Sequence, residues 1–89
     1  MKIKEKAQEI AAITEQKNQA YGNSYHRCHV MLTELWPDGV PVSDYKKLLA
    51  VARIIDKLFR IANDENAFSE DPWRDIAGYA ILMSSNEDK

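Results

Sequence analysis

The stretch 43-SDYKKLLAVARIIDKLFRIAN-63 carries the strongest structural signal in the chain, because it contains neither glycine nor proline. Ser43 is a favourable N-cap, and Asp44 suits a first helical turn. At 100° per residue six charged side chains fall in one polar stripe about 120° wide, and most of the remaining surface is apolar. They are Lys46, Arg53, Asp56, Lys57, Arg60 and Asp64. A helix that is apolar around about two thirds of its girth must be covered on more than one side, so this is the predicted central helix.

The residues before this helix predict two more. Residues 2–19 place apolar side chains every three or four positions, which is the spacing of an amphipathic helix. Asn23 or Ser24 can cap a second helix, which is predicted to run to Trp36. The segment 37-PDGVP-41 then breaks the helical pattern, because proline, aspartate and glycine gather there.

A fourth helix is predicted after the polar loop 63-NDENAFS-69. Ser69 is the expected N-cap, with Glu70 and Asp71 in the first turn. Gly78 costs about 1 kcal/mol relative to alanine inside a helix, which indicates close approach of another helix or of a ligand. The side chains expected on the buried side are Trp73, Ile76, Ala77, Ala80 and Met83 or Leu82.

No segment alternates in the manner of a strand, so the chain is predicted to be one all-α domain over residues 1–89. Three to four helices would form a small bundle, with a frayed tail at about 84–89. A chain of this length buries only about 60–65% of the surface that its unfolded form exposes. The apolar excess of the central helix therefore predicts a bundle that is completed by homodimerisation.

The composition of the chain limits the kinds of partner that it can bind and the cellular compartment in which it is expected. The net charge of −2 speaks against a nucleic-acid partner, since proteins that bind nucleic acid usually carry a basic face. No apolar run approaches the roughly 18 residues of a membrane span, and the charged N-terminus is unlike a signal peptide. The single cysteine, Cys28, excludes an internal disulfide. We therefore expect a cytoplasmic protein with no membrane partner.

The polar stripe of the central helix has two interpretations. Arg53, Asp56, Lys57 and Arg60 share one face at spacings of three and four residues. In the first interpretation this face is solvated, and its ion pairs contribute about 0.2–0.5 kcal/mol each. In the second it is a phosphate clamp, since guanidinium and ammonium groups aimed at one place suit phosphate oxygens and Asp56 can hold a cation.

The acidic residues near the start of the fourth helix are also open to two interpretations. Asp71 and Asp75 are four residues apart, so they would project from one face and repel each other unless a cation lies between them. Together with Glu70 they predict an Mg²⁺ site, because this ion takes oxygen ligands and bridges to substrate phosphate. Alternatively, Glu70 and Asp71 stabilise the helix dipole and Asp75 pairs with an arginine. The arginines available to Asp75 are Arg53, Arg60 and Arg74.

The junction 17-KNQAYGNSY-25 is a third candidate site. Four side chains flank Gly22 where the first helix meets the second: Lys17, Tyr21, Ser24 and Tyr25. Amides at the start of the second helix can hold an anion, and Tyr21 can stack on a base. The alternative is a glycine that ends one helix, followed by a polar residue that caps the next.

Three motifs together resemble a known family. They are K-x3-YG-x-S, R-x2-DK-x2-R and E-D-x-W-x-D-x-AGYA, and they span residues 17–82. This order resembles the nucleotide-modification-associated domain 1 group, small all-helical proteins of bacteriophages, prophages and bacteria. That group is similar in style to the MazG-like all-α nucleotide pyrophosphohydrolases.

The resemblance implies a pocket between helices that handles a nucleotide, in the host cytoplasm if the chain is phage-encoded. The residues that it assigns are Lys17, Tyr21, Gly22, Ser24, Arg53, Asp56, Lys57, Arg60, Glu70, Asp71, Asp75 and Tyr79. One departure concerns catalysis. The pyrophosphohydrolases carry E-x2-E on one helix and E-x2-D on another, whereas the late acidic pair of this chain is spaced by four. A two-metal site would be short of carboxylates, so hydrolysis is less well supported than binding.

Two functions follow from the sequence. In the first, the protein binds a nucleotide or another small phosphate ligand with Mg²⁺, and any reaction would be Mg²⁺-assisted attack of water on a nucleoside triphosphate. In the second, it is a non-enzymatic phage accessory module, a homodimer whose charged residues form a structural ion-pair network. The sequence leaves open whether the protein is an enzyme.

Overall fold

The computed structural model describes residues 2–85, which form four α-helices and two short 3₁₀ turns, with no strand in this range. The elements are α1 (Ile3–Ala20), α2 (Ser24–Leu35), η1 (Val42–Asp44), α3 (Tyr45–Asp64), η2 (Ala67–Ser69) and α4 (Pro72–Ser85). The all-α prediction is therefore confirmed. Of the predicted tail, residues 84 and 85 belong to α4, and 86–89 lie outside the described residues.

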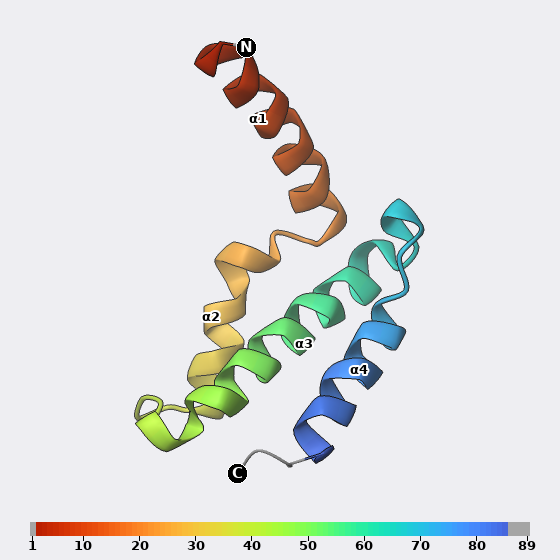
Figure 1. Ribbon diagram of the computed structural model, residues 1–89. Coiled ribbons are helices and arrows are strands. Elements are labelled where there is room, and N and C mark those ends of the chain that lie inside the picture. Colours follow the sequence, from red (N-terminus) through yellow and green to blue (C-terminus); the bar gives the residue numbers. More distant parts are fainter. Residues whose placement is uncertain (1, 86–89) are drawn as a thin grey trace.

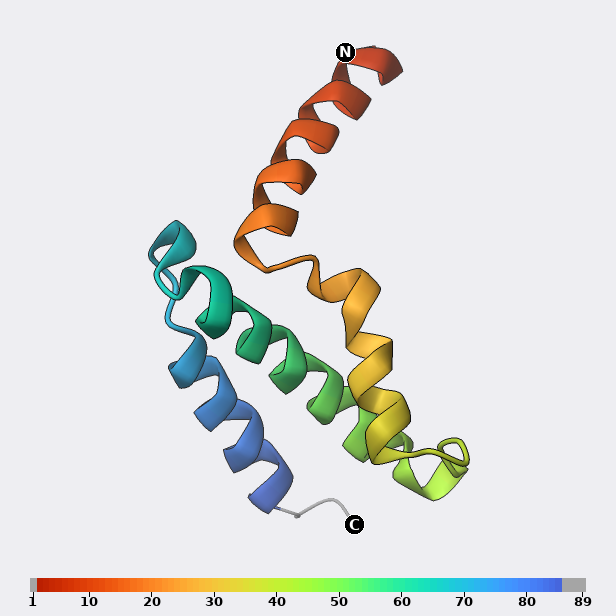
Figure 2. The ribbon, with the colours of Figure 1, turned by 180° about the vertical axis from the view of Figure 1, so that it is seen from behind.

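The longest helix, α3, occupies the centre of the bundle, as predicted. Both α2 and α4 pack along it, whereas α1 projects away from the other three helices and touches α3 near one end (Figure 1). The view from behind shows the same arrangement (Figure 2). The fold is thus a three-helix body with a helical arm.

The core of this body is small. Among the described residues the buried apolar side chains are Ile55 and Ala67, and Pro72 is also fully buried. The chain exposes 7012 Å² to solvent, whereas a compact protein of its mass exposes about 5,300 Å². Its radius of gyration of 15.8 Å likewise exceeds the value of about 12 Å expected for this length.

The helix starts differ from the predicted caps at α2 and α3. Asn23 precedes α2 in a left-handed conformation with φ of 60° and makes no side-chain cap, and Ser24 uses its hydroxyl elsewhere. The turn η1 begins after Pro41, so Ser43 lies inside this turn and does not cap α3. Asp44 instead accepts a hydrogen bond from the Trp36 indole at 3.1 Å.

The predicted start and the predicted inner face of α4 are also corrected. Ser69 lies in η2, and Asp71 caps α4 by accepting hydrogen bonds from the amides of Trp73 at 3.0 Å and Arg74 at 3.3 Å. Among the elements of residues 2–85, α3 makes the main contact with α4, so only a narrow stripe of α4 is covered. Trp73 is among the exposed residues. The covered stripe contains Pro72, Asp75, Ile76, Tyr79 and Met83, while Ala77, Ala80 and Leu82 are exposed.

Gly78 does not mark a close approach within the described part of the chain. Apart from its chain neighbours and the backbone of its own helix, a Cβ atom added there would meet no atom of residues 2–85 within 4 Å. The expected approach of another helix of the same chain is therefore wrong.

Candidate functional site

The polar stripe of α3 borders a groove between α2, α3 and α4, which we call the α2–α3 groove. Its volume is about 800 Å³. The side chains that line it are Ser24, Tyr25, Cys28, His29 and Leu32 of α2, Leu49, Ala52, Arg53, Asp56 and Lys57 of α3, and Tyr79 of α4. Five residues predicted for the site, Ser24, Arg53, Asp56, Lys57 and Tyr79, therefore meet in one place.

Two polar contacts cross this groove from α3. The hydroxyl of Ser24, which is 4% exposed, donates a short hydrogen bond to the carboxylate of Asp56. On the other side, Lys57 Nζ lies 3.5 Å from Asp75 Oδ2 on α4. Asp56 is thus bonded to α2 and Lys57 to α4. These two adjacent residues place a negative and a positive charge side by side at the groove.

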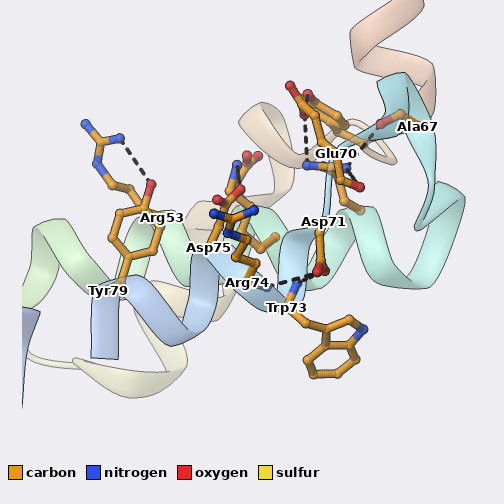
Figure 3. Close-up of polar contacts among 12 residues, drawn as sticks. Arg53, Ala67, Glu70, Asp71, Trp73, Arg74, Asp75 and Tyr79 are labelled. Atoms are coloured by element: carbon orange, nitrogen blue, oxygen red, sulfur yellow. Dashed lines mark hydrogen bonds and ion pairs between the residues drawn. The ribbon is translucent and has the colours of Figure 1, made fainter. Parts of the chain in front are cut away.

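Arg53 contacts α4 on one side of the groove. Its Nη1 lies 3.5 Å from the Tyr79 hydroxyl, and its guanidinium carbon lies 5.9 Å from the centre of that ring (Figure 3). The side chain remains exposed. A weak contact to a neutral hydroxyl leaves the guanidinium able to bind an anion that enters the groove.

Arg60, seven residues further along the same stripe, lies in a different environment. It is fully buried, and its Nη1 lies 3.0 Å from Glu70 Oε1. Its Nη2 donates to the carbonyls of Ala67 and Glu70, both at 3.2 Å (Figure 3). The Tyr21 ring covers the guanidinium at 5.3 Å. Arg60 therefore holds the η2 turn against α3 and does not line the α2–α3 groove.

The acidic residues predicted to share a metal ion are divided among separate partners. Glu70 pairs with Arg60, Asp71 caps α4, and Asp75 pairs with Lys57. Within residues 2–85 no three acidic, histidine or cysteine side chains gather in a metal-binding arrangement. Asp56 and Asp75 are the predicted metal ligands that remain next to the groove.

The residues of the helix junction lie in the cluster around Arg60, where Lys17 is exposed and Tyr21 and Gly22 are half-buried. Lys17 Nζ lies 5.9 Å from the centre of the Phe68 ring, and Tyr21 meets that ring edge-on at 6.3 Å. Burial and the neighbouring Glu70 carboxylate raise the pKa of Tyr21, whose hydroxyl lies 3.4 Å from that carboxylate. Gly22 adopts a left-handed conformation with φ of 66°. Lys17, Tyr21 and Gly22 thus shape the turn between α1 and α2.

On the α2 wall of the groove, the sequence pointed to Ser24 and Tyr25 within the junction 17–25, but it did not assign Cys28, His29 or Leu32 to the site. Tyr25, Cys28, His29 and Leu32 follow Ser24 at helical spacing, and this spacing was the available signal. Burial and the Asp56 carboxylate raise the pKa of Cys28, so its thiol keeps its proton at neutral pH. A protonated thiol is a poor nucleophile, so we assign Cys28 a packing role in the wall of the groove and no reactive role.

Comparisons of this chain with protein-family models, with curated proteins and with solved structures find no match. None of the helices in residues 2–85 is long and apolar enough to cross a membrane.

Proposed function

We propose that this protein binds a nucleotide, or a similar small molecule with a phosphate group, in the α2–α3 groove. The observation that supports this most is the joint presence of Arg53 and Lys57 at a concave site. A volume of about 800 Å³ falls in the range of about 300–1,000 Å³ that is typical of small-molecule sites. Two cations beside aromatic rings suit a ligand that is anionic at one end and planar at the other.

Each lining residue has a role in this proposal. The exposed guanidinium of Arg53 would bind phosphate oxygens through its planar fork. Lys57, whose side chain is 18% exposed, would add a second positive charge. The rings of Tyr25 and Tyr79 offer faces on which a base can stack.

A magnesium ion fits this site as a companion of the ligand. Mg²⁺ is usually held by one or two carboxylates together with substrate phosphates and water. Asp56 and Asp75 could supply these carboxylates, since Asp56 lines the groove and Asp75 contacts Lys57 at its edge. Glu70 pairs with Arg60, and Asp71 accepts an amide of α4, so neither carboxylate is free to hold a second metal ion. We therefore propose binding, and a product assay would test hydrolysis separately.

A thermal-shift experiment tests the proposal. Nucleoside mono-, di- and triphosphates are added with and without Mg²⁺ to the wild type, Arg53→Gln, Lys57→Gln and Lys47→Gln. Lys47 is the matched control, because it also lies on α3 and also pairs with an aspartate, Asp44, at 3.5 Å. A ligand at 100 times its Kd stabilises the fold by about 2.7 kcal/mol, or by several degrees.

We expect that shift in the wild type and in Lys47→Gln, and its loss in Arg53→Gln and Lys57→Gln. The absence of a shift with every nucleotide, or equal shifts in all four proteins, would overturn the proposal.

The second candidate function is a non-enzymatic interaction module, and the Arg60 cluster favours it. A fully buried arginine that contacts one carboxylate and two carbonyls is the structural network that this hypothesis expects. In that case Lys57 and Asp75 would be a further part of the network, and no nucleotide would bind.

A further inference from the structure

The helical arm α1 has an apolar face that the described part of its own chain leaves uncovered. Ile3, Ala7, Ile10 and Ile13 recur at spacings of four and three residues, and residues 3–19 are all exposed. Ile3 is 89% exposed and Ile10 is 54% exposed. An amphipathic helix gains most of its stability from packing this face, so the arm lacks its main source of stability in the single chain.

The α1–α2 junction directs the arm away from its own body in this structure. Gly22 and Asn23 are both left-handed, and a Cβ atom added at Gly22 would collide with the Asn63 side chain. Tyr21 and Phe68 meet ring to ring on the same side of the junction. The end of α1 is therefore held against α3 and η2 while the rest of the helix points away (Figures 1 and 2).

The body has an uncovered apolar surface of its own, between the first half of α3 and the second half of α4. We call it the α3–α4 trough; it has a volume of about 400 Å³. Leu49 and Leu82 line it and are 67% and 68% exposed. Met83 also lines it and is half-buried. The other lining side chains are Ala50, Tyr79 and the polar Lys46, Arg53 and Ser85. Apolar side chains that gather in one exposed hollow make this surface a candidate for contact with another chain.

The chain exposes more surface than a compact monomer, and this excess is about the area that two standard interfaces would bury on one chain. The exposed area of 7012 Å² exceeds that of a compact monomer by about 1,700 Å². A standard interface buries about 800 Å² on each partner. Pairing one α1 with another α1 would cover the arms and leave both troughs open, whereas reciprocal docking of arm into trough covers both surfaces.

We propose that the apolar face of α1 docks into the α3–α4 trough of a second copy of this chain, and that the second copy returns the contact. The resulting homodimer has two equal arm-to-trough interfaces related by a twofold axis. Leu49, Arg53 and Tyr79 line both the trough and the α2–α3 groove, so a docked arm would border the proposed nucleotide site. The test of docking uses the protein without any ligand, so its outcome does not depend on nucleotide binding.

The first experiment measures molar mass by light scattering for three proteins: the wild type, Ala7→Glu and Ala12→Glu. Ala7 belongs to the apolar face, and Ala12 lies on the opposite side of α1. Both alanines are exposed, and both substitutions change charge and helix propensity equally.

We expect twice 10.2 kDa for the wild type and for Ala12→Glu, and either monomer or unfolded chain for Ala7→Glu. An unfolded Ala7→Glu also supports docking, since an exposed alanine in a monomer tolerates glutamate. A monomeric wild type, or a dimeric Ala7→Glu, would overturn the proposal.

The second experiment locates the partner surface with Leu82→Glu and Ile81→Glu. These neighbours are 68% and 67% exposed, and Leu82 lines the trough whereas Ile81 does not. Leu82→Glu is expected to be monomeric and Ile81→Glu dimeric. Mixing Ala7→Glu with Leu82→Glu should restore a dimer, because one arm and one trough are intact in that pair. A dimeric Leu82→Glu, or a mixture that stays monomeric, would show that the arm docks elsewhere.

Discussion

Arg60 and the pair Asp56–Lys57 lie on one stripe of α3, yet their environments differ. Arg60 is closed off by Glu70, the Ala67 carbonyl and Tyr21, and it has no exposed surface. Asp56 and Lys57 each have one partner and border an open groove. The same types of residue at the same helical spacing therefore serve two purposes, and the turn that folds over one of them makes the difference.

Removal of Arg60 should produce the largest effect on stability. Arg60→Ala removes the donor from the carbonyls of Ala67 and Glu70 and opens the packing under η2. An acceptor left unpaired costs about 1–3 kcal/mol, so we expect a loss of about 2–6 kcal/mol in the free energy of unfolding. Arg53→Ala is the matched comparison on the same stripe, and its cost should stay within about 0.5 kcal/mol because the side chain is exposed. Urea denaturation followed by circular dichroism measures both. Equal losses in the two variants would mean that Arg53 and Arg60 contribute equally to stability, which contradicts the comparison.

Ser24→Ala should have the next largest effect. The hydroxyl is buried and donates to Asp56, so its removal leaves a half-buried carboxylate without that donor. We expect a loss of about 1–3 kcal/mol. Ser85→Ala is a control on an exposed serine whose hydroxyl bonds to a backbone carbonyl of its own helix. A Ser24→Ala protein as stable as the wild type would show that Asp56 does not depend on α2.

Asp71→Ala separates a helix cap from a metal ligand. Because Asp71 accepts the amides of Trp73 and Arg74, we expect a loss of about 1 kcal/mol without any added ion. Asp71→Asn should retain most of this stability, since asparagine caps helices about as well. If Asp71→Asn is instead fully stable but loses a Mg²⁺-dependent shift with nucleotide, Asp71 belongs with the groove residues after all.

The sequence predicted the all-α class and the central helix because both follow from periodicity. It did not predict which part of the polar stripe is buried. That outcome depends on η2, where Phe68 and Ser69 adopt left-handed conformations. Such conformations are usually predicted from glycine, and neither position is a glycine. Likewise, Asp71 and Asp75 have the spacing of a shared helical face, but α4 begins at Pro72. Asp71 therefore precedes the helix, and its carboxylate accepts a hydrogen bond from a helix amide.

Asp75→Asn should have the smallest effect on stability. Its carboxylate is 45% exposed and lies 3.5 Å from Lys57, so the ion pair is worth about 0.2–1 kcal/mol. Urea denaturation of Asp75→Asn, with Asp38→Asn as a control in the exposed loop before α3, measures this cost. A loss near 0.5 kcal/mol leaves Asp75 available for a ligand, whereas a loss of about 3–5 kcal/mol would place it in the same class as Arg60. In the second case the whole α3 stripe would be one structural network, and the interaction module would replace nucleotide binding as the better account of this protein.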